Sequence, residues 1–132
     1  MGNAVAAPSG KPNAFRPHEH LRRPTDFRRV YDRRRSASDG WLIVYACENA
    51  LGHLRIGLSV SRKNGGAVQR NRMRRLYREA FRLTRSELPA AGLDLVLIPR
   101  SPEEPPLEEL KASLRKLVPL AARKLAREAP PP

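Results

Sequence analysis

Apolar residues recur at spacings of three and four in three segments of the chain, and this period predicts three helices. The first starts at Pro24-Thr25-Asp26, with Thr25 or Asp26 as its N-cap. The second lies within residues 61–85. The third starts at Leu107, and Pro119 is expected to end or kink it. The apolar positions that define the three helices are Phe27, Val30 and Tyr31; Met73, Leu76, Ala80 and Leu83; and Leu107, Leu110, Leu114 and Leu117.

Four other segments have the composition or the two-residue period of β-strands. Residues 41–47 are apolar throughout, and residues 35–39 are expected to form a short edge strand. Residues 93–98, LDLVLI, are expected to form a buried strand that ends before Pro99. Residues 54–61 alternate, so one face is aliphatic and the other is small and polar. A bulky ligand could approach that second face closely, but an ordinary solvent-facing sheet would have the same pattern. The predicted order is helix, short strand, strand, strand, helix, strand, helix, which is an α+β fold.

The length of 132 residues fits one domain with a modest core. Residues 1–20 are rich in Ala, Pro, Gly and Asn, and they are expected to form a flexible N-terminal extension. The domain itself is expected to span residues 21–122. Residues 123–132 end in prolines and are expected to form a tail.

The formal net charge of +13 and the pI of about 11.3 are extreme for a chain of this size. They indicate nucleic acid or an anionic membrane surface as the partner. No apolar run approaches the ~18 residues of a membrane span, and the N-terminus lacks the apolar stretch of a secretory signal. These features predict a cytoplasmic protein without a membrane partner.

Residues 61–85 carry the highest density of charge, with nine basic residues and one acid, Glu79. Arg70, Arg74, Arg78 and Arg82 lie four apart, so they form one line along the predicted helix. Like charges at this spacing repel each other, and a polyanion such as RNA would neutralise them. The alternative interpretation is an ordinary amphipathic helix with a solvated basic face.

The same segment contains a motif, R-K-x-G-x-A-V-x-R-N-R-x-R-R, at residues 62–75. It resembles the signature loop and helix of the protein subunit of bacterial ribonuclease P, and the resemblance covers about residues 21–122. The resemblance implies an αβββαβα sandwich like the second domain of ribosomal protein S5, with a left-handed βαβ crossover. General statistics would favour a right-handed crossover.

The resemblance also implies the function and the candidate site. The chain would bind the catalytic RNA and the 5′ leader of precursor tRNA, and assist endonucleolytic removal of the leader. The leader would run single-stranded through a cleft between the first helix and the sheet. The candidate RNA-binding residues are Arg62, Lys63, Arg70, Asn71, Arg72, Arg74, Arg75 and Arg78. The candidates to line the leader cleft are Phe27, Tyr31, Ser59 and Ser61. The competing interpretation makes Phe27 and Tyr31 plain core residues.

The sequence contains no arrangement of a self-sufficient hydrolase. The acids, among them Asp26, Asp32, Asp39 and Asp94, are spread out or placed on exposed elements, and no phosphate-binding Walker loop is present. No metal is expected on the protein, and by resemblance Mg²⁺ is bound by the RNA subunit and the substrate. No obligatory protein partner is expected.

Two other classes of protein account for the charge and the size. A basic RNA-packing protein of the ribosome does so equally well, but it does not explain the Gly-x-Ala-Val-x-Arg-Asn frame of the motif. A DNA-compacting protein is less favoured, because the helix has no dimer zipper or second reading element.

Overall fold

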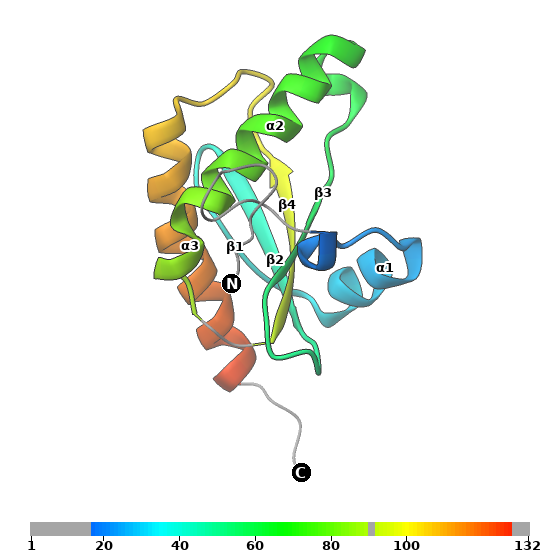
Figure 1. The fold of residues 1–132 in the computed structure, drawn as a ribbon, viewed down its shortest axis with the longest axis vertical. Coiled ribbons are helices and arrows are strands. Elements are labelled where there is room, and N and C mark those ends of the chain that lie inside the picture. The colour runs from blue at the N-terminus through cyan, green and yellow to red at the C-terminus, as the bar shows by residue number, and fades with distance from the viewer. Residues whose placement is uncertain (1–16, 90–91, 128–132) are drawn as a thin grey trace, which may run out of the picture.

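The computed structural model describes residues 17–89 and 92–127, and it confirms the predicted α+β class and order of elements (Figure 1). Three short 3₁₀ turns accompany the main elements: η1 (Pro17–Glu19), η2 (Arg62–Asn64) and η3 (Arg85–Glu87). The helices and strands are α1 (Pro24–Arg33), β1 (Arg35–Ser38), β2 (Leu42–Glu48), β3 (Arg55–Leu58), α2 (Ala67–Thr84), β4 (Leu93–Pro99) and α3 (Leu107–Arg127).

The four strands form one mixed sheet in the order β1-β2-β4-β3. β4 pairs antiparallel with β2 and parallel with β3, so the parallel pair is joined through α2. In Figure 1 both parallel strands run upward, α2 lies in front of the sheet, and β4 lies to the left of β3. This is the left-handed crossover that the family resemblance implied, against the general preference.

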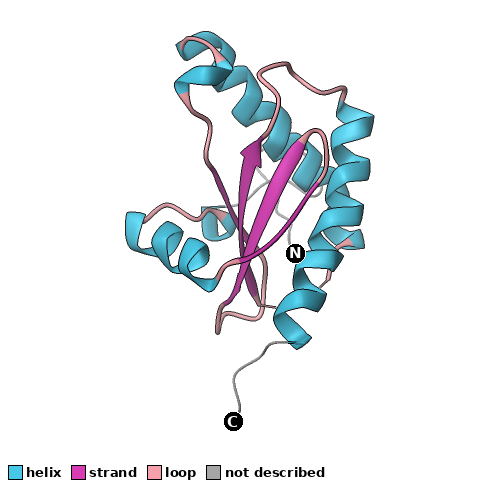
Figure 2. Ribbon diagram, turned by 180° about the vertical axis from the view of Figure 1, so that it is seen from behind, coloured by secondary structure: helices cyan, strands magenta, loops and turns pink. Residues whose placement is uncertain are grey.

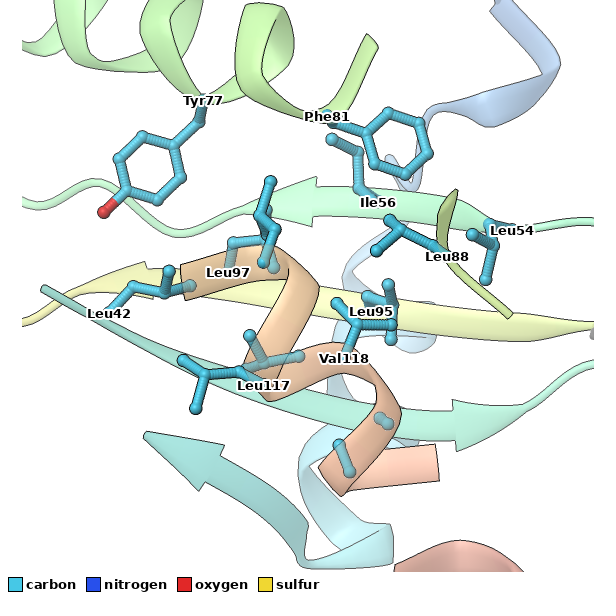
Figure 3. Close-up of a cluster of buried hydrophobic side chains, with 14 of the residues drawn as sticks. Leu42, Leu54, Ile56, Tyr77, Phe81, Leu88, Leu95, Leu97, Leu117 and Val118 are labelled. Atoms are coloured by element: carbon cyan, nitrogen blue, oxygen red, sulfur yellow. The ribbon is translucent and has the colours of Figure 1, made fainter. Parts of the chain in front are cut away.

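Helices cover both faces of the sheet. α2 and α3 lie on one face, where they enclose the larger core, and α1 lies on the other (Figures 1 and 2). Figure 3 shows Leu95 and Leu97 of β4 among the side chains of the larger core. Val96 points to the opposite face and packs in the smaller core with Val30 of α1. Both faces of β4 are therefore buried, which explains the apolar run from Leu95 to Ile98 within it.

Several predicted boundaries differ from those of the structure. α1 starts at Pro24 with Arg23 as N-cap, not Thr25 or Asp26, because proline is well suited to the first helical position. Pro119 does not end α3, which continues to Arg127. The missing N–H of proline removes one helical hydrogen bond, but Leu125 beyond it is 2% exposed, and its burial favours the longer helix. The predicted tail, 123–132, therefore starts too early, and its residues 128–132 lie outside the described part.

The predicted extension, residues 1–20, also ends too late. Residues 17–20 pack along the free edge of β3, where His20 forms a parallel bridge with Ile56. The N–H of Leu21 donates to the carbonyl of Ile56 at 2.8 Å, and the buried Glu19 pairs with Arg85. These are mostly backbone contacts, so the side-chain pattern gave no sign of them. Residues 1–16 of the predicted extension lie outside the described part of the chain.

Candidate RNA-binding surface

The turn before α2 is held by a buried side chain, Asn64, which is 4% exposed. Its Oδ1 accepts a hydrogen bond from the N–H of Ser61 at 3.2 Å, and its Nδ2 donates to the carbonyl of Ser101 at 3.3 Å. Gly65 follows at a φ of 108°, which side chains disfavour. This turn fixes the exposed Arg62 and Lys63 beside the start of α2. Asn64 was not among the predicted site residues, because it occupies a variable position of the motif.

The basic residues of α2 differ in how they are neutralised. Arg82 pairs with Glu79 at 2.6 Å, and Arg72 pairs with Glu104 of the β4–α3 loop at 3.2 Å. Among the described residues, Arg70, Arg74, Arg75 and Arg78 have no carboxylate partner.

Asn71 is exposed and accepts a hydrogen bond from Arg74 at 2.9 Å. The Nε of Arg70 is buried without any hydrogen-bond partner in that part of the chain. An anion at this surface would supply the missing acceptors.

A groove lies between α2 and the segment that leads into α1. Arg74 and Arg78 of α2 line it on one side, and Arg22 lines it opposite them. The other lining residues are His20, Leu21, Phe27, Ile56, Gly57 and Leu58. Burial lowers the pKa of Arg78, and the charges of Arg74 and Arg22 lower it further. Burial, Arg22 and Arg78 likewise lower the pKa of His20. Cations thus crowd one another in this groove, and a bound phosphate would relieve their repulsion.

The floor of the groove depends on a close approach of Phe27 to Gly57. A Cβ at position 57 would lie 2.5 Å from the Cζ of Phe27 and 3.1 Å from the Cβ of Leu21. Only glycine therefore allows the ring to lie against β3. Phe27 remains half-buried, so its ring both fills the floor and stays accessible from the groove. The small face predicted for residues 54–61 thus accommodates a side chain of the protein itself.

The four candidates for the leader cleft do not all line this groove. Phe27 does, but Tyr31, Ser59 and Ser61 do not. Tyr31 is half-buried at the margin of the smaller core, where its ring meets that of Tyr45 edge-on at 5.2 Å. Ser61 is exposed and precedes the turn at Asn64. The structure adds Arg22 and His20 to the groove, and neither stood out in the sequence.

A buried carboxylate, Asp94, fixes α1 and the β2–β3 connection on the sheet. The prediction that Asp94 is one of several dispersed or exposed acids was wrong, since its side chain is 0% exposed. Arg55 donates two hydrogen bonds to it at 2.8 and 2.7 Å, Asn49 donates a third at 2.7 Å, and Arg29 of α1 pairs with it. Burial opposes its ionisation, but the hydrogen bonds from Arg55, Asn49 and Arg29 together keep the pKa of Asp94 below its ordinary value.

The described residues include no cluster of three or more His, Cys, Asp or Glu side chains that could hold a metal ion. Cys47 is buried and lies 3.1 Å from a guanidinium nitrogen of Arg29. In the same part of the chain, no helix is long and apolar enough to span a membrane.

Comparison with known proteins agrees with the motif. The family model described as Ribonuclease P matches residues 15–121. The ribonuclease P protein component of Clostridioides difficile (strain 630) is 38% identical over 99 residues, which are 74% of this chain and 87% of that protein. The corresponding protein of Chloroflexus aurantiacus is 44% identical over 100 residues, 74% of this chain and 73% of that protein.

Solved structures extend the similarity to the fold. The RNase P protein of Staphylococcus aureus aligns with a TM-score of 0.67 at 31% identity, covering 78% of this chain and 94% of that one. The RNase P protein of Thermotoga maritima aligns with a TM-score of 0.65 at 31% identity, covering 73% and 91%. The matched region includes both the basic helix and the groove, and the chain belongs to the ribonuclease P protein family.

Proposed function

We propose that this chain is the protein subunit of ribonuclease P, which binds the catalytic RNA and the 5′ leader of precursor tRNA and assists removal of the leader. The observation that carries the leader contact is the groove in which Arg22, Arg74 and Arg78 face one another without a carboxylate partner among the described residues. Phe27 on its floor offers an aromatic ring to an unpaired base. The ribosomal and DNA-compacting alternatives lose their support, because the family match explains the whole motif.

The arginines of α2 divide between two sides of the helix, and the proposal gives each side its own RNA. Arg74 and Arg78 line the groove and contact the leader. Arg72 and Arg75 line a separate hollow with Glu104, and together with Arg62 and Lys63 they contact the catalytic RNA. Phosphate contacts of this kind position an RNA without reading its sequence.

The chemistry of the proposed enzyme belongs to the RNA subunit and its Mg²⁺ ions. The acids of the protein serve its structure: Asp94 is saturated by Arg29, Arg55 and Asn49, and Asp39 accepts hydrogen bonds from Trp41, Leu42 and Ser113. The protein alone is therefore expected not to cleave precursor tRNA, with or without Mg²⁺. The proposal includes a cytoplasmic location and no obligatory protein partner.

The test is reconstitution with the cognate catalytic RNA at low Mg²⁺, with cleavage and affinity measured for precursor and mature tRNA. Wild-type protein is expected to restore cleavage and to favour the precursor. Arg78→Ala should weaken precursor binding by about tenfold to a hundredfold, because a charge-assisted hydrogen bond is worth about 1.5–3 kcal/mol, while mature tRNA should be unaffected. Arg123→Ala, an exposed position of α3, is the matched control. Equal losses for both RNAs with Arg78→Ala would place the leader elsewhere.

A further inference from the structure

A second pocket opens at the start of α1 and shares two lining residues with the groove. We call it the α1 pocket. Its lining residues are His20, Arg22, Arg23, Asp26, Arg29, Glu48, Asn49, Ala50, Leu51 and Arg55. His20 and Arg22 line both hollows, so the two meet along one short segment of backbone. A strand that lies in the groove can therefore continue into the α1 pocket without leaving the surface.

The charges of the α1 pocket are unevenly matched. Arg29 and Arg55 are held by the buried Asp94, and Glu48 is held by Arg33 through two hydrogen bonds of 3.0 and 3.1 Å. Asp26 lies 3.8 Å from Arg29 and 3.9 Å from Arg55, so it too faces this cluster.

Arg22 and Arg23 are exposed, and neither has a carboxylate partner among the described residues. The pocket therefore presents the guanidinium groups of Arg22 and Arg23 to an incoming anion, whereas its other charged side chains are already paired.

The opposite rim of the α1 pocket is apolar. Leu51 is 51% exposed and is one of only two large hydrophobic residues exposed in the described part of the chain. The β2–β3 connection holds it in place. The Oδ1 of Asn49 accepts a hydrogen bond from the N–H of Leu51 at 2.9 Å, and the Nδ2 of Asn49 donates to Asp94 at 2.7 Å. Ala50 extends the apolar rim.

We infer that the α1 pocket is a second binding site for single-stranded RNA, which takes the upstream part of the leader after it leaves the groove. This inference rests on the proposed function. Arg22 and Arg23 bind phosphates of the strand, and Leu51 packs against a base or ribose. The occupant is single-stranded, because a duplex presents its phosphates but keeps its base faces stacked inside, which would leave Leu51 in water.

The experiment uses reconstituted holoenzyme and a series of precursor tRNAs whose leaders are lengthened one nucleotide at a time. Wild-type affinity should rise in two stages, first as the groove fills and then as the α1 pocket fills. Arg23→Glu and Leu51→Ser should abolish the second stage and leave the first. For a long leader we expect Arg23→Glu to lose about tenfold in affinity, which equals 1.4 kcal/mol. For a leader that ends in the groove we expect no loss.

Two comparisons decide the outcome. Arg123→Glu on α3 makes the same change of charge far from the leader and should leave both stages intact, and thermal unfolding of each variant checks the fold. A loss for Arg23→Glu that is equal at all leader lengths, or no loss at all, would overturn the inference. Arg78→Ala separates this failure from failure of the proposed function. If that variant still loses the first stage, the groove holds the leader and only the α1 pocket is wrong.

Discussion

Replacing Asp94 by asparagine tests whether the buried carboxylate is what holds α1 and β3 together. The substitution preserves the size of the side chain but removes its charge. Asp94 is fully buried, while the side chains of its partners Arg29 and Arg55 are 39% and 20% exposed. In the variant, one amide oxygen must replace two carboxylate oxygens that now accept from Arg29, Arg55 and Asn49.

The expected loss of unfolding free energy depends on the two arginines that remain without their carboxylate after the substitution. Breaking a buried ion pair by removing one partner costs about 3–5 kcal/mol. Both arginines can turn partly toward water, so we expect a loss near the lower end, about 3 kcal/mol of the free energy of unfolding. For a domain of this size, that loss lowers the melting temperature by roughly 10 °C. Urea denaturation followed by circular dichroism at pH 7 measures the free energy directly.

The effect should also depend on pH. The folded-state pKa of Asp94 is depressed, whereas an aspartate in the unfolded chain titrates near about 3.9. The stabilisation is therefore fully present above pH ~4 and is lost as the pH falls through the lower, folded-state pKa. The difference between wild type and Asp94→Asn should be largest at neutral pH and shrink below pH ~4.

Glu48→Gln is the matched control, because it also removes a carboxylate paired with an arginine of α1. Glu48 is 46% exposed in its side chain, so its pair with Arg33 is screened by solvent and should contribute at most about 1 kcal/mol. A loss below about 1 kcal/mol for Asp94→Asn, or equal losses for both variants, would refute the role given to burial here.

Three further predictions concern single contacts, and a fourth concerns the whole basic surface. Tyr77→Phe removes a buried hydroxyl that has no hydrogen-bond partner among the described residues, and it should raise the free energy of unfolding by up to about 1 kcal/mol; a loss would reveal a missed partner. Glu104→Gln frees Arg72 and should tighten binding of the catalytic RNA by about twofold to fivefold in a filter-binding titration, whereas unchanged affinity would mean that Arg72 stays solvated. Gly57→Ala should displace Phe27, cost about 1–3 kcal/mol in urea denaturation and weaken binding of precursor tRNA; wild-type values for both would contradict the tight contact. If the whole basic surface neutralises about five or six RNA phosphates, the logarithm of the RNA-binding constant should fall with the logarithm of salt concentration with a slope near −4 to −5. A slope shallower than about −2 would favour a solvated helix face.

Side-chain periodicity predicted the elements of this fold well, because most of them bury one continuous face. The stripe through Met73 and Ala80 and the apolar run of β4 both identify segments that pack on the same core. The basic line on α2 was equally visible, since helical spacing alone places Arg74 and Arg78 side by side. The handedness of the crossover could not be derived in this way, and it came only from the family resemblance.

The composition of the groove was less accessible to sequence analysis. Arg22 and His20 reach it because backbone hydrogen bonds fasten their segment to the edge of β3. Such bonds use groups that every residue carries, so they leave no pattern in the sequence. Asp94 was misjudged for a related reason. Its partners Arg29 and Arg55 are distant in the chain, and only the tertiary structure shows that they meet.

The relation between Phe27 and Gly57 resolves a choice that the sequence left open. For the aromatic side chains of α1, packing on the sheet and contact with a ligand were competing interpretations. Phe27 meets both descriptions, because one side of its ring lies against Gly57 while the residue remains half-buried and lines the groove. In the proposed complex, packing would hold the ring in place before RNA arrives, so less conformational entropy would be lost when a base stacks on it. Tyr31 lacks this arrangement: it packs edge-on against Tyr45 and lies outside the groove lining. Position on the first helix alone therefore does not place an aromatic side chain in the groove, and the glycine beneath the ring is the feature that distinguishes Phe27 from Tyr31.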